Sequence, residues 1–169
     1  MSTTRMSSTR THTIVDSPVG ALTLVDEDGA LAGVWMTDQR HLPGVEAAGH
    51  RDDTVLPQLR EQLAAYWERQ LRTFDVPLVK QGTDFQQIVW AALRRIPYGE
   101  TWSYGRLAVE VGQPTASRAV GMANGRNPVG IVVPCHRVIG STGSLVGYGG
   151  GLERKKFLLA LENGVDALA

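Results

Sequence analysis

Cysteine is nearly absent from this sequence of 169 residues, which contains only Cys135. A single thiol cannot close an internal disulfide, and it cannot build a zinc site of several thiolates. The four histidines (His12, His41, His50 and His136) show no metal-ligand spacing with one another or with Cys135. We therefore expect no metal and no cofactor, and this cysteine usage favours a reducing, cytoplasmic environment.

Long apolar runs are absent as well, so the sequence contains no candidate for a membrane-spanning helix and we expect no membrane partner. The first residues, MSTTRMSSTRTHT, lack the apolar core of a secretory signal. Their Ser, Thr and Arg content faintly resembles an organelle transit peptide, but we favour a flexible tail over residues 1–11.

Net charge is zero over the whole chain, but the charges that are present are unevenly distributed. Residues 1–80 contain 8 Lys and Arg against 11 Asp and Glu, whereas residues 94–156 contain 9 against 3. The basic region could face the phosphates of a nucleic acid. A mixed, solvated surface is the alternative, and charge alone does not decide between them.

The first eighty residues predict a small α/β lobe. Residues 12–37 contain three apolar segments separated by SPVG and by an Asp-Gly turn, which predicts a short antiparallel meander. Residues 38–53 show no periodicity and are expected to form a loop. FDVPL, near the end of this half, reads as a short extended piece. Between residues 54 and 71 a helix is predicted by the spacing of Leu56, Leu59, Leu63, Tyr66 and Trp67.

The second half predicts a series of helices. Thr83 or Asp84 can cap the first one, which ends at IPYGET. Ser103 can cap YGRLAVEV, and Thr115 can cap ASRAVGMA. Two short helices joined by a glycine-containing turn are typical of a helix-turn-helix, and the small residues of the second let its backbone approach another surface closely. A tightly packed internal helix is the alternative. The inward face of the first helix would comprise Phe85, Ile88, Val89, Ala92, Leu93 and Ile96.

Cys135 follows Pro134 and the segment VGIVV, which predicts a buried strand. Proline cannot donate a ladder hydrogen bond, so we expect the strand to end there and the cysteine to lie at a strand-to-loop junction. A lone buried cysteine is usually a small apolar residue. Here the adjacent His136 and Arg137 favour a thiolate, and hence a nucleophile.

His136 is the candidate base for this nucleophile. Adjacent residues of an extended chain point to opposite sides, so His136 would reach the sulfur only through a water or a sharp turn of the backbone. It would also need a carboxylate to orient it. Glu162, on a last helix predicted over residues 153–163, is a candidate, as are Glu100 and Glu153, and spacing does not choose among them.

The run PCHRVIG, with RAVGMANGRNP ahead of it and GYGGGLERK behind, resembles the O6-alkylguanine-DNA alkyltransferase family, the methylated-DNA–protein-cysteine methyltransferases. The resemblance is dense over residues 81–163 and looser in the N-terminal half. It implies an α+β protein. Residues 1–80 would form a small α/β lobe with a short antiparallel sheet, and residues 81–169 a mainly helical, winged helix-turn-helix-like domain that binds DNA and carries the active site.

The resemblance also implies direct DNA repair by a suicide enzyme. The alkyl group of O6-alkylguanine, and of O4-alkylthymine, in double-stranded DNA would pass irreversibly to the protein's own cysteine. The base would first be flipped out of the duplex by a helix-turn-helix in the minor groove, because a stacked base is out of reach. The family pattern implies a monomer, with cooperative clustering on DNA as a further possibility.

By the same resemblance, Cys135 is the alkyl acceptor and His136, through a water, takes its proton. Glu162 orients His136, and Tyr104 donates a proton or hydrogen bond toward purine N3. Substrate contacts are implied for Val138 through its carbonyl, for Tyr148 and Gly149 over the base, and for Asn127, which braces the turn before the active site. DNA contacts are implied for Arg118, which fills the space of the flipped base, and for Ala119 and Ser103.

One of these positions departs from the family pattern, because some members carry a serine where this chain has Gly149. A hydroxyl contact to O6 is then missing. We expect the backbone N–H to make this contact instead and the pocket to tolerate larger alkyl groups.

Two other functions compete with alkyl transfer. A lesion binder without chemistry is disfavoured by Cys135, and a thiol hydrolase would turn over repeatedly. Arg118 could instead pair with Glu110, which would remove it from DNA contact.

Overall fold

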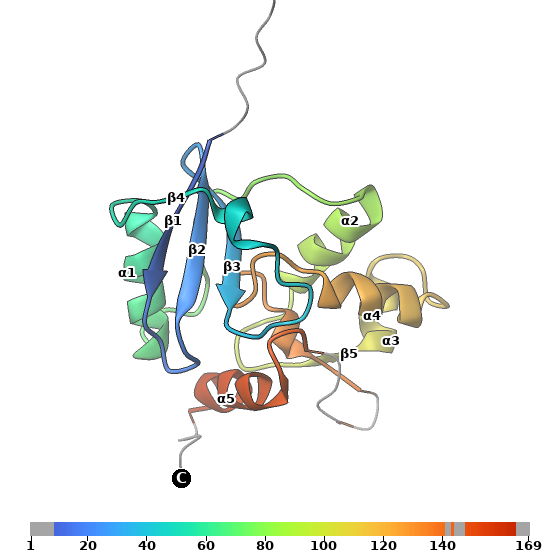
Figure 1. Ribbon diagram of the computed structural model, residues 1–169. Coiled ribbons are helices and arrows are strands. Elements are labelled where there is room, and N and C mark those ends of the chain that lie inside the picture. The colour runs from blue at the N-terminus through green and yellow to red at the C-terminus, as the bar shows by residue number, and fades with distance from the viewer. Residues whose placement is uncertain (1–8, 141–142, 144–147, 165–169) are drawn as a thin grey trace, which may run out of the picture.

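The computed structural model describes residues 9–140, 143 and 148–164. An N-terminal lobe built on a sheet lies beside a lobe of helices, and the last helix lies below the seam between them (Figure 1). The protein is therefore α+β, as expected from the sequence. Among the residues described, no helix has the length and apolarity needed to cross a membrane.

The expected meander is confirmed. Strands β1 (Arg10–Val15), β2 (Leu22–Glu27) and β3 (Ala30–Met36) pair antiparallel in sequence order. The β2–β3 turn is the Asp-Gly pair, and both of its residues have positive φ, 52° and 91°. Because β1 begins at Arg10, the last two residues of the expected tail belong to the sheet, while residues 1–8 lie outside the described part.

The expectation of a plain loop over residues 38–53 is wrong. A 3-10 turn, η1 (Val45–Ala48), is followed by a short strand, β4 (His50–Arg51), that pairs parallel with β1. Gly49 makes this return possible, because its φ is 70° and a Cβ there would lie 1.8 Å from the carbonyl oxygen of Arg10. A two-residue strand carries no periodicity, so the sequence pattern could not show it.

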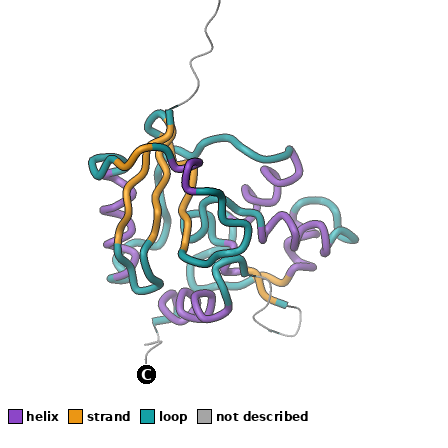
Figure 2. Tube along the Cα trace, viewed as in Figure 1, coloured by secondary structure: helices purple, strands orange, loops and turns teal. Residues whose placement is uncertain are grey.

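Helix α1 (Pro57–Trp67) lies behind the sheet (Figures 1 and 2), with Leu59, Leu63 and Tyr66 buried as predicted. The extended piece after it is also confirmed. Leu31 of β3 exchanges backbone hydrogen bonds with the segment around residue 78. Its N–H donates to the carbonyl of Pro77 at 2.8 Å, and its carbonyl accepts from the N–H of Val79 at 2.9 Å. The sheet order is β3-β2-β1-β4.

In the helical lobe, α2 (Asp84–Leu93) is capped by Thr83 and α3 (Tyr104–Glu110) by Ser103, both as predicted. Helix α4 (Ser117–Gly125) corrects the prediction for Thr115, because its N-cap is Ala116 and no side chain caps it. Ile88 was expected to face inward but is 51% exposed. The buried face of α2 is formed by Val89, Ala92 and Leu93, and Ile88 lies at its edge, about 100° from Val89 around the helix.

The segment VGIVV is buried as predicted, but it is not a strand. Ile131 has a φ of 73°, and Val133 N donates to Val129 O at 3.0 Å, so the chain turns back on itself. A turn packed between two lobes needs the same apolar residues as a core strand. The 3-10 turn η2 (Cys135–Arg137) follows, and then β6 (Val138–Ile139), which pairs with β5 (Trp102–Ser103).

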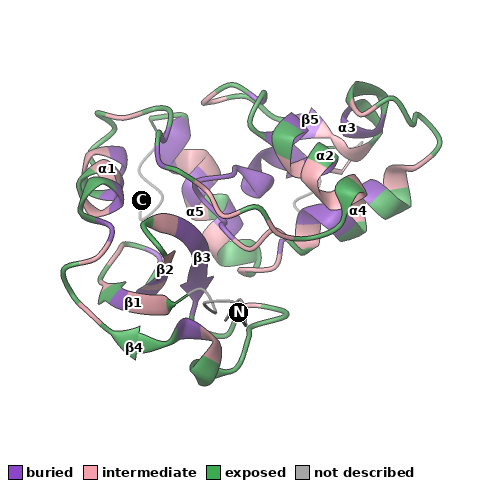
Figure 3. Ribbon diagram, turned by 90° about the horizontal axis from the view of Figure 1, so that it is seen from above, coloured by how far each residue is buried: buried purple, intermediate pink, exposed green. Residues whose placement is uncertain are grey.

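The last helix, α5 (Leu152–Glu162), begins one residue before its predicted start. The glycine-rich loop expected ahead of it falls largely on residues 141–142 and 144–147, which lie outside the described residues. One apolar core joins β3 and α1 to α2, α3 and α5, and Figure 3 marks buried residues in both lobes. This shared core holds the buried turn that carries Cys135.

Candidate active site

Cys135 is the first residue of η2 and is only 7% exposed. A cavity of about 30 Å³ reaches it, with walls from both lobes, including Met36, Asn127, Tyr148 and Gly149. This is room for roughly one water molecule and far too little for a purine.

Burial raises the pKa of the Cys135 thiol, although a hydrogen bond with Asn127 and the charge of Lys155 act in the opposite direction. The expectation that its neighbours make it a thiolate is therefore wrong. Arg137 turns away from the sulfur, toward Glu162 and the carbonyl of Ile96. A buried neutral thiol needs a base before it becomes a nucleophile.

His136 is completely buried, and its Nε2 lies 2.8 Å from Oε2 of Glu162 on α5. Arg137 donates to both carboxylate oxygens, from Nε at 2.8 Å and from Nη2 at 3.0 Å. The hydroxyl of Tyr66, on α1, donates to Oε2 at 2.5 Å. The other two candidate carboxylates do not reach the imidazole, because Glu100 and Glu153 are exposed.

Protonation states follow from this geometry. Burial alone would raise the pKa of Glu162, but the hydrogen bonds and charges of His136 and Arg137 outweigh it and hold this pKa well below its usual range. The carboxylate is an anion and only accepts hydrogen bonds. Burial lowers the pKa of His136, so the imidazole is neutral and carries its proton on Nε2. Its Nδ1, buried without a hydrogen-bond partner among the described residues, keeps a free lone pair.

The backbone turns sharply at the cysteine, which begins the 3-10 turn η2. Asn127 Nδ2 donates to the carbonyl of Val133 at 2.8 Å, and its Oδ1 accepts from the N–H of Val129 at 3.1 Å. Asn124 Nδ2 donates to the Cys135 carbonyl at 3.4 Å. Two side-chain amides thus hold the turn from which the thiol projects.

Val138 is fully buried, and its carbonyl accepts a hydrogen bond from Lys155 Nζ at 2.5 Å. Burial lowers the pKa of this lysine to about 8. A carbonyl oxygen has two lone pairs, so the Val138 oxygen can still accept from a substrate amine. Lys155 was not a candidate from the sequence, yet it shares a helical face with Leu158 and Glu162, which is the pattern of an inward position.

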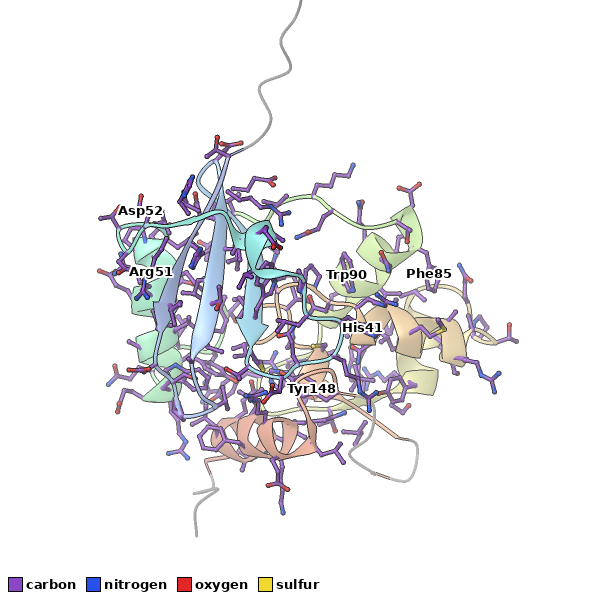
Figure 4. All side chains as sticks on the ribbon, in the orientation of Figure 1. His41, Arg51, Asp52, Phe85, Trp90 and Tyr148 are labelled. Atoms are coloured by element: carbon purple, nitrogen blue, oxygen red, sulfur yellow. The ribbon has the colours of Figure 1, made fainter. Side chains whose placement is uncertain are left out.

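Tyr148 is buried against β3, with its hydroxyl 3.9 Å from Met36 Sδ, and Figure 4 shows it above α5. Gly150 permits this fold, because a Cβ there would lie 2.5 Å from the Tyr148 ring. At Gly149 a Cβ would meet only the carbonyl oxygen of Gly125, at an ordinary 3.5 Å. A serine would therefore fit at position 149.

An exposed groove of about 650 Å³ adjoins the cavity and shares Arg40, Gly125 and Gly149 with it. Tyr104 of α3 lines it, half-buried, and burial raises the pKa of its phenol. Arg118 and Ala119 are exposed on α4, and Arg118 lines the groove.

The alternative pairing of Arg118 with Glu110 is wrong. Within the described part of the chain, the ion pairs of Glu110 run to Arg95 at 3.8 Å and Arg106 at 3.9 Å. Ser103 Oγ accepts from the N–H of Arg106 at 3.0 Å, so its observed contact is the cap of α3. Its contact with DNA stays a prediction.

The N-terminal lobe contributes to the groove through Arg40 and His41, which follow β3 (Figure 4). The Arg40 N–H also donates to the carbonyl of Gly149 at 2.7 Å. Neither residue was a candidate, because an aperiodic loop gives no sign of what it packs against. No group of three or more His, Cys, Asp and Glu side chains gathers for a metal ion in residues 9–140, 143 and 148–164.

Comparison with known proteins identifies the family of this chain. Two family models match, the 6-O-methylguanine DNA methyltransferase DNA binding domain over residues 84–164 and the ribonuclease-like domain of the same proteins over residues 11–79. Methylated-DNA–protein-cysteine methyltransferase from Mycolicibacterium paratuberculosis is 52% identical over 148 residues, 88% of this chain and 89% of that protein.

The relative of the same name from Methanosarcina acetivorans is 46% identical over 152 residues, covering 89% of this chain and 97% of its own. Among solved structures, Mycobacterium tuberculosis OGT in complex with DNA matches with a TM-score of 0.89 and 48% identity, over 93% of this chain and 96% of that one. This chain belongs to the O6-alkylguanine-DNA alkyltransferase family, the methylated-DNA–protein-cysteine methyltransferases.

Proposed function

We propose that this chain repairs double-stranded DNA by taking the alkyl group of an O6-alkylguanine, or of an O4-alkylthymine, irreversibly onto Cys135. One molecule acts once, as a monomer. The observation that carries the proposal is the buried pair of His136 and Glu162, which presents an unprotonated Nδ1 one residue from a buried thiol. A buried base of this kind serves proton transfer and has no other partner among the residues described.

The reaction begins with a proton. Cys135 gives it to Nδ1 of His136 through one bridging water, and Glu162 stabilises the imidazolium that forms. The thiolate attacks the alkyl carbon while the carbon–O6 bond breaks, and both electrons of that bond leave with the purine. Tyr104 donates a hydrogen bond or a proton at N3, which neutralises the departing base.

DNA lies along α4 in the minor groove. Small exposed residues such as Ala119 let the helix backbone approach the sugar-phosphate walls, and Arg118 enters the stack in place of the flipped base. Arg126 and Arg40 line the same groove and would meet phosphates. Ser103, at the start of α3, would contact the backbone beside them.

The flipped base needs more room than the cavity at Cys135 offers. Widening must occur between Gly149 and the loop after β3, where Arg40 and Gly149 are joined by a single backbone hydrogen bond. Inside, the Val138 carbonyl would accept from the guanine amine, Tyr148 would cover the ring, and the N–H of Gly149 would face O6. Asn127 would hold the turn beneath them.

Intact-protein mass spectrometry after mixing with duplex oligonucleotide containing O6-methylguanine tests the proposal. We expect one added methyl group per molecule, located on Cys135 by peptide mapping, and none in Cys135→Ser, which should still bind the lesion. The same measurement is made with a duplex that contains O4-methylthymine. Repeated turnover would indicate a thiol hydrolase, and binding without mass gain a lesion binder, and either result would reject alkyl transfer.

A further inference from the structure

We infer that Tyr66, in the N-terminal lobe, positions Glu162 and thereby holds His136 ready to accept the proton of Cys135. The inference rests on the proposed function and assigns a part of the reaction to a lobe in which the sequence showed no chemical motif. Tyr66 touches neither the sulfur nor the substrate, so it acts as a positioning residue.

Tyr66 lies in the last turn of α1 and is fully buried. Its hydroxyl donates at 2.5 Å to Oε2 of Glu162, 96 residues away, the same oxygen that lies 2.8 Å from His136 Nε2. A second contact fixes α1 against α5 at this point, since Arg69 Nε donates to the carbonyl of Leu161 at 2.9 Å. The end of α1 is thus docked on the turn of α5 that carries the carboxylate.

Four N–H or O–H groups hold the Glu162 carboxylate. Three bind Oε2, from Tyr66, His136 and Arg137 Nη2, and Arg137 Nε binds Oε1. With donors on both oxygens, the carboxylate cannot rotate without losing a buried hydrogen bond. Its orientation fixes which nitrogen of His136 donates, and so keeps Nδ1 as the free base.

The Tyr66 hydroxyl also reduces the negative charge that Oε2 presents to His136. Three donors share Oε2, and without the hydroxyl only His136 Nε2 and Arg137 Nη2 would remain on that oxygen. An imidazolium would then be better stabilised, and more of His136 would already hold a proton before Cys135 offers one. The other charged or titratable groups near the pair include Arg137, Lys155 and Tyr148, with Tyr98 beyond Tyr66.

Tyr98 is a matched control for the hydroxyl of Tyr66. Its ring packs edge-on against Tyr66, with 6.3 Å between centroids, and the Arg137 guanidinium lies 5.7 Å from its centre. Its hydroxyl makes no hydrogen bond within the described residues. Tyr98→Phe therefore removes the same atom from the same aromatic cluster and leaves Glu162 untouched.

The test compares full-length wild type, Tyr66→Phe and Tyr98→Phe. Single-turnover methyl transfer from duplex DNA is measured with protein in excess, across the histidine range of about pH 5 to 8. In Tyr66→Phe we expect the rate at neutral pH to fall on the order of tenfold, because a buried charge-assisted hydrogen bond is lost. The fall in rate on the acid side of its pH profile should move to higher pH. Tyr98→Phe should superimpose on the wild type.

A lower active fraction in Tyr66→Phe with an unchanged rate and pH profile would show that the tyrosine only packs, and would overturn the inference. The inference would also be overturned if Tyr66→Phe slowed transfer by the same factor in a Glu162→Gln background as in the wild type. The effect of the hydroxyl must pass through the carboxylate, so it should be lost in that background. Failure of the wild type to acquire a methyl group would reject the proposed function itself. A wild type that transfers, beside an unaffected Tyr66→Phe, would reject this inference alone.

Discussion

The cluster around Glu162 and the groove along α4 are both polar, and they are built in opposite ways. In the cluster, a carboxylate, an imidazole, a guanidinium and a phenol are buried and bonded to one another. In the groove, Arg118 and Arg126 are exposed, and neither has an ion pair among the residues described. The two regions are separated by the small cavity at Cys135.

This difference matches what the proposed function asks of each region. Proton transfer needs groups whose geometry and protonation are set before substrate arrives, so the cost of desolvation is met in folding. Binding to phosphates needs exposed cations that can displace the counterions condensed on the DNA. Substitutions in the cluster should therefore change both stability and chemistry, whereas substitutions in the groove should change action on DNA alone.

The largest effect is expected for Glu162→Gln, which breaks the cluster. Arg137 loses its buried counter-ion, which costs about 3–5 kcal/mol of unfolding free energy. The amide also allows the wrong imidazole tautomer, so transfer should slow on the order of a hundredfold or more. Urea unfolding and single-turnover rates measure the two effects. Glu153→Gln, on the exposed face of the same helix, should change neither, and a wild-type rate in Glu162→Gln would refute the role of the pair.

Arg118→Ala tests the groove. Transfer from duplex DNA should fall by roughly one order of magnitude, since nothing replaces the flipped base in the stack. Transfer from the free base O6-benzylguanine should stay close to wild type, and the unfolding free energy should change by less than about 0.5 kcal/mol. Arg51→Ala, on the far side of the N-terminal lobe (Figure 4), is the control. Equal losses with duplex and free base would contradict the assignment.

Acidification should reduce the folding stability that the cluster around Glu162 contributes. The folded pKa values of His136 and Glu162 both lie below their unfolded values, so the unfolded chain takes up these protons first. Stability should be complete above about pH 6.5, fall as His136 titrates, and fall again below about pH 4.3. Denaturant unfolding at a series of pH values measures this. The lower step should be missing in Glu162→Gln, and a flat wild-type profile would contradict the protonation states.

The smallest effect is expected for Arg126→Ala. In a Cys135→Ser background, binding to duplex DNA should weaken as salt rises, and loss of one phosphate contact should reduce the logarithmic slope by about 0.9. Fluorescence anisotropy over a salt series measures the slope. The Glu162→Gln substitution in the same background should leave it unchanged. A slope that Arg126→Ala does not alter would remove this arginine from the phosphate contacts.

Local features of the sequence were sufficient for much of the fold. Thr83 and Ser103 were identified as caps, and the Asp-Gly turn placed the β2–β3 hairpin, because each of these signals acts within about four residues. The motif around Cys135 led to the family, and with it to His136 and Glu162. What failed were segments whose residues suit two structures, such as VGIVV, which forms a buried turn.

The sequence by itself determined the order of the helices and of the first three strands, the family, and Cys135 as the candidate nucleophile. Tertiary structure alone decided that Tyr66 reaches Glu162, that Arg40 and His41 line the groove, and that the thiol is buried and neutral. The physical reason is range. Helix caps, turns and apolar periodicity depend on neighbours along the chain, whereas hydrogen bonds between residues 96 apart and the desolvation that shifts a pKa depend on how both lobes pack.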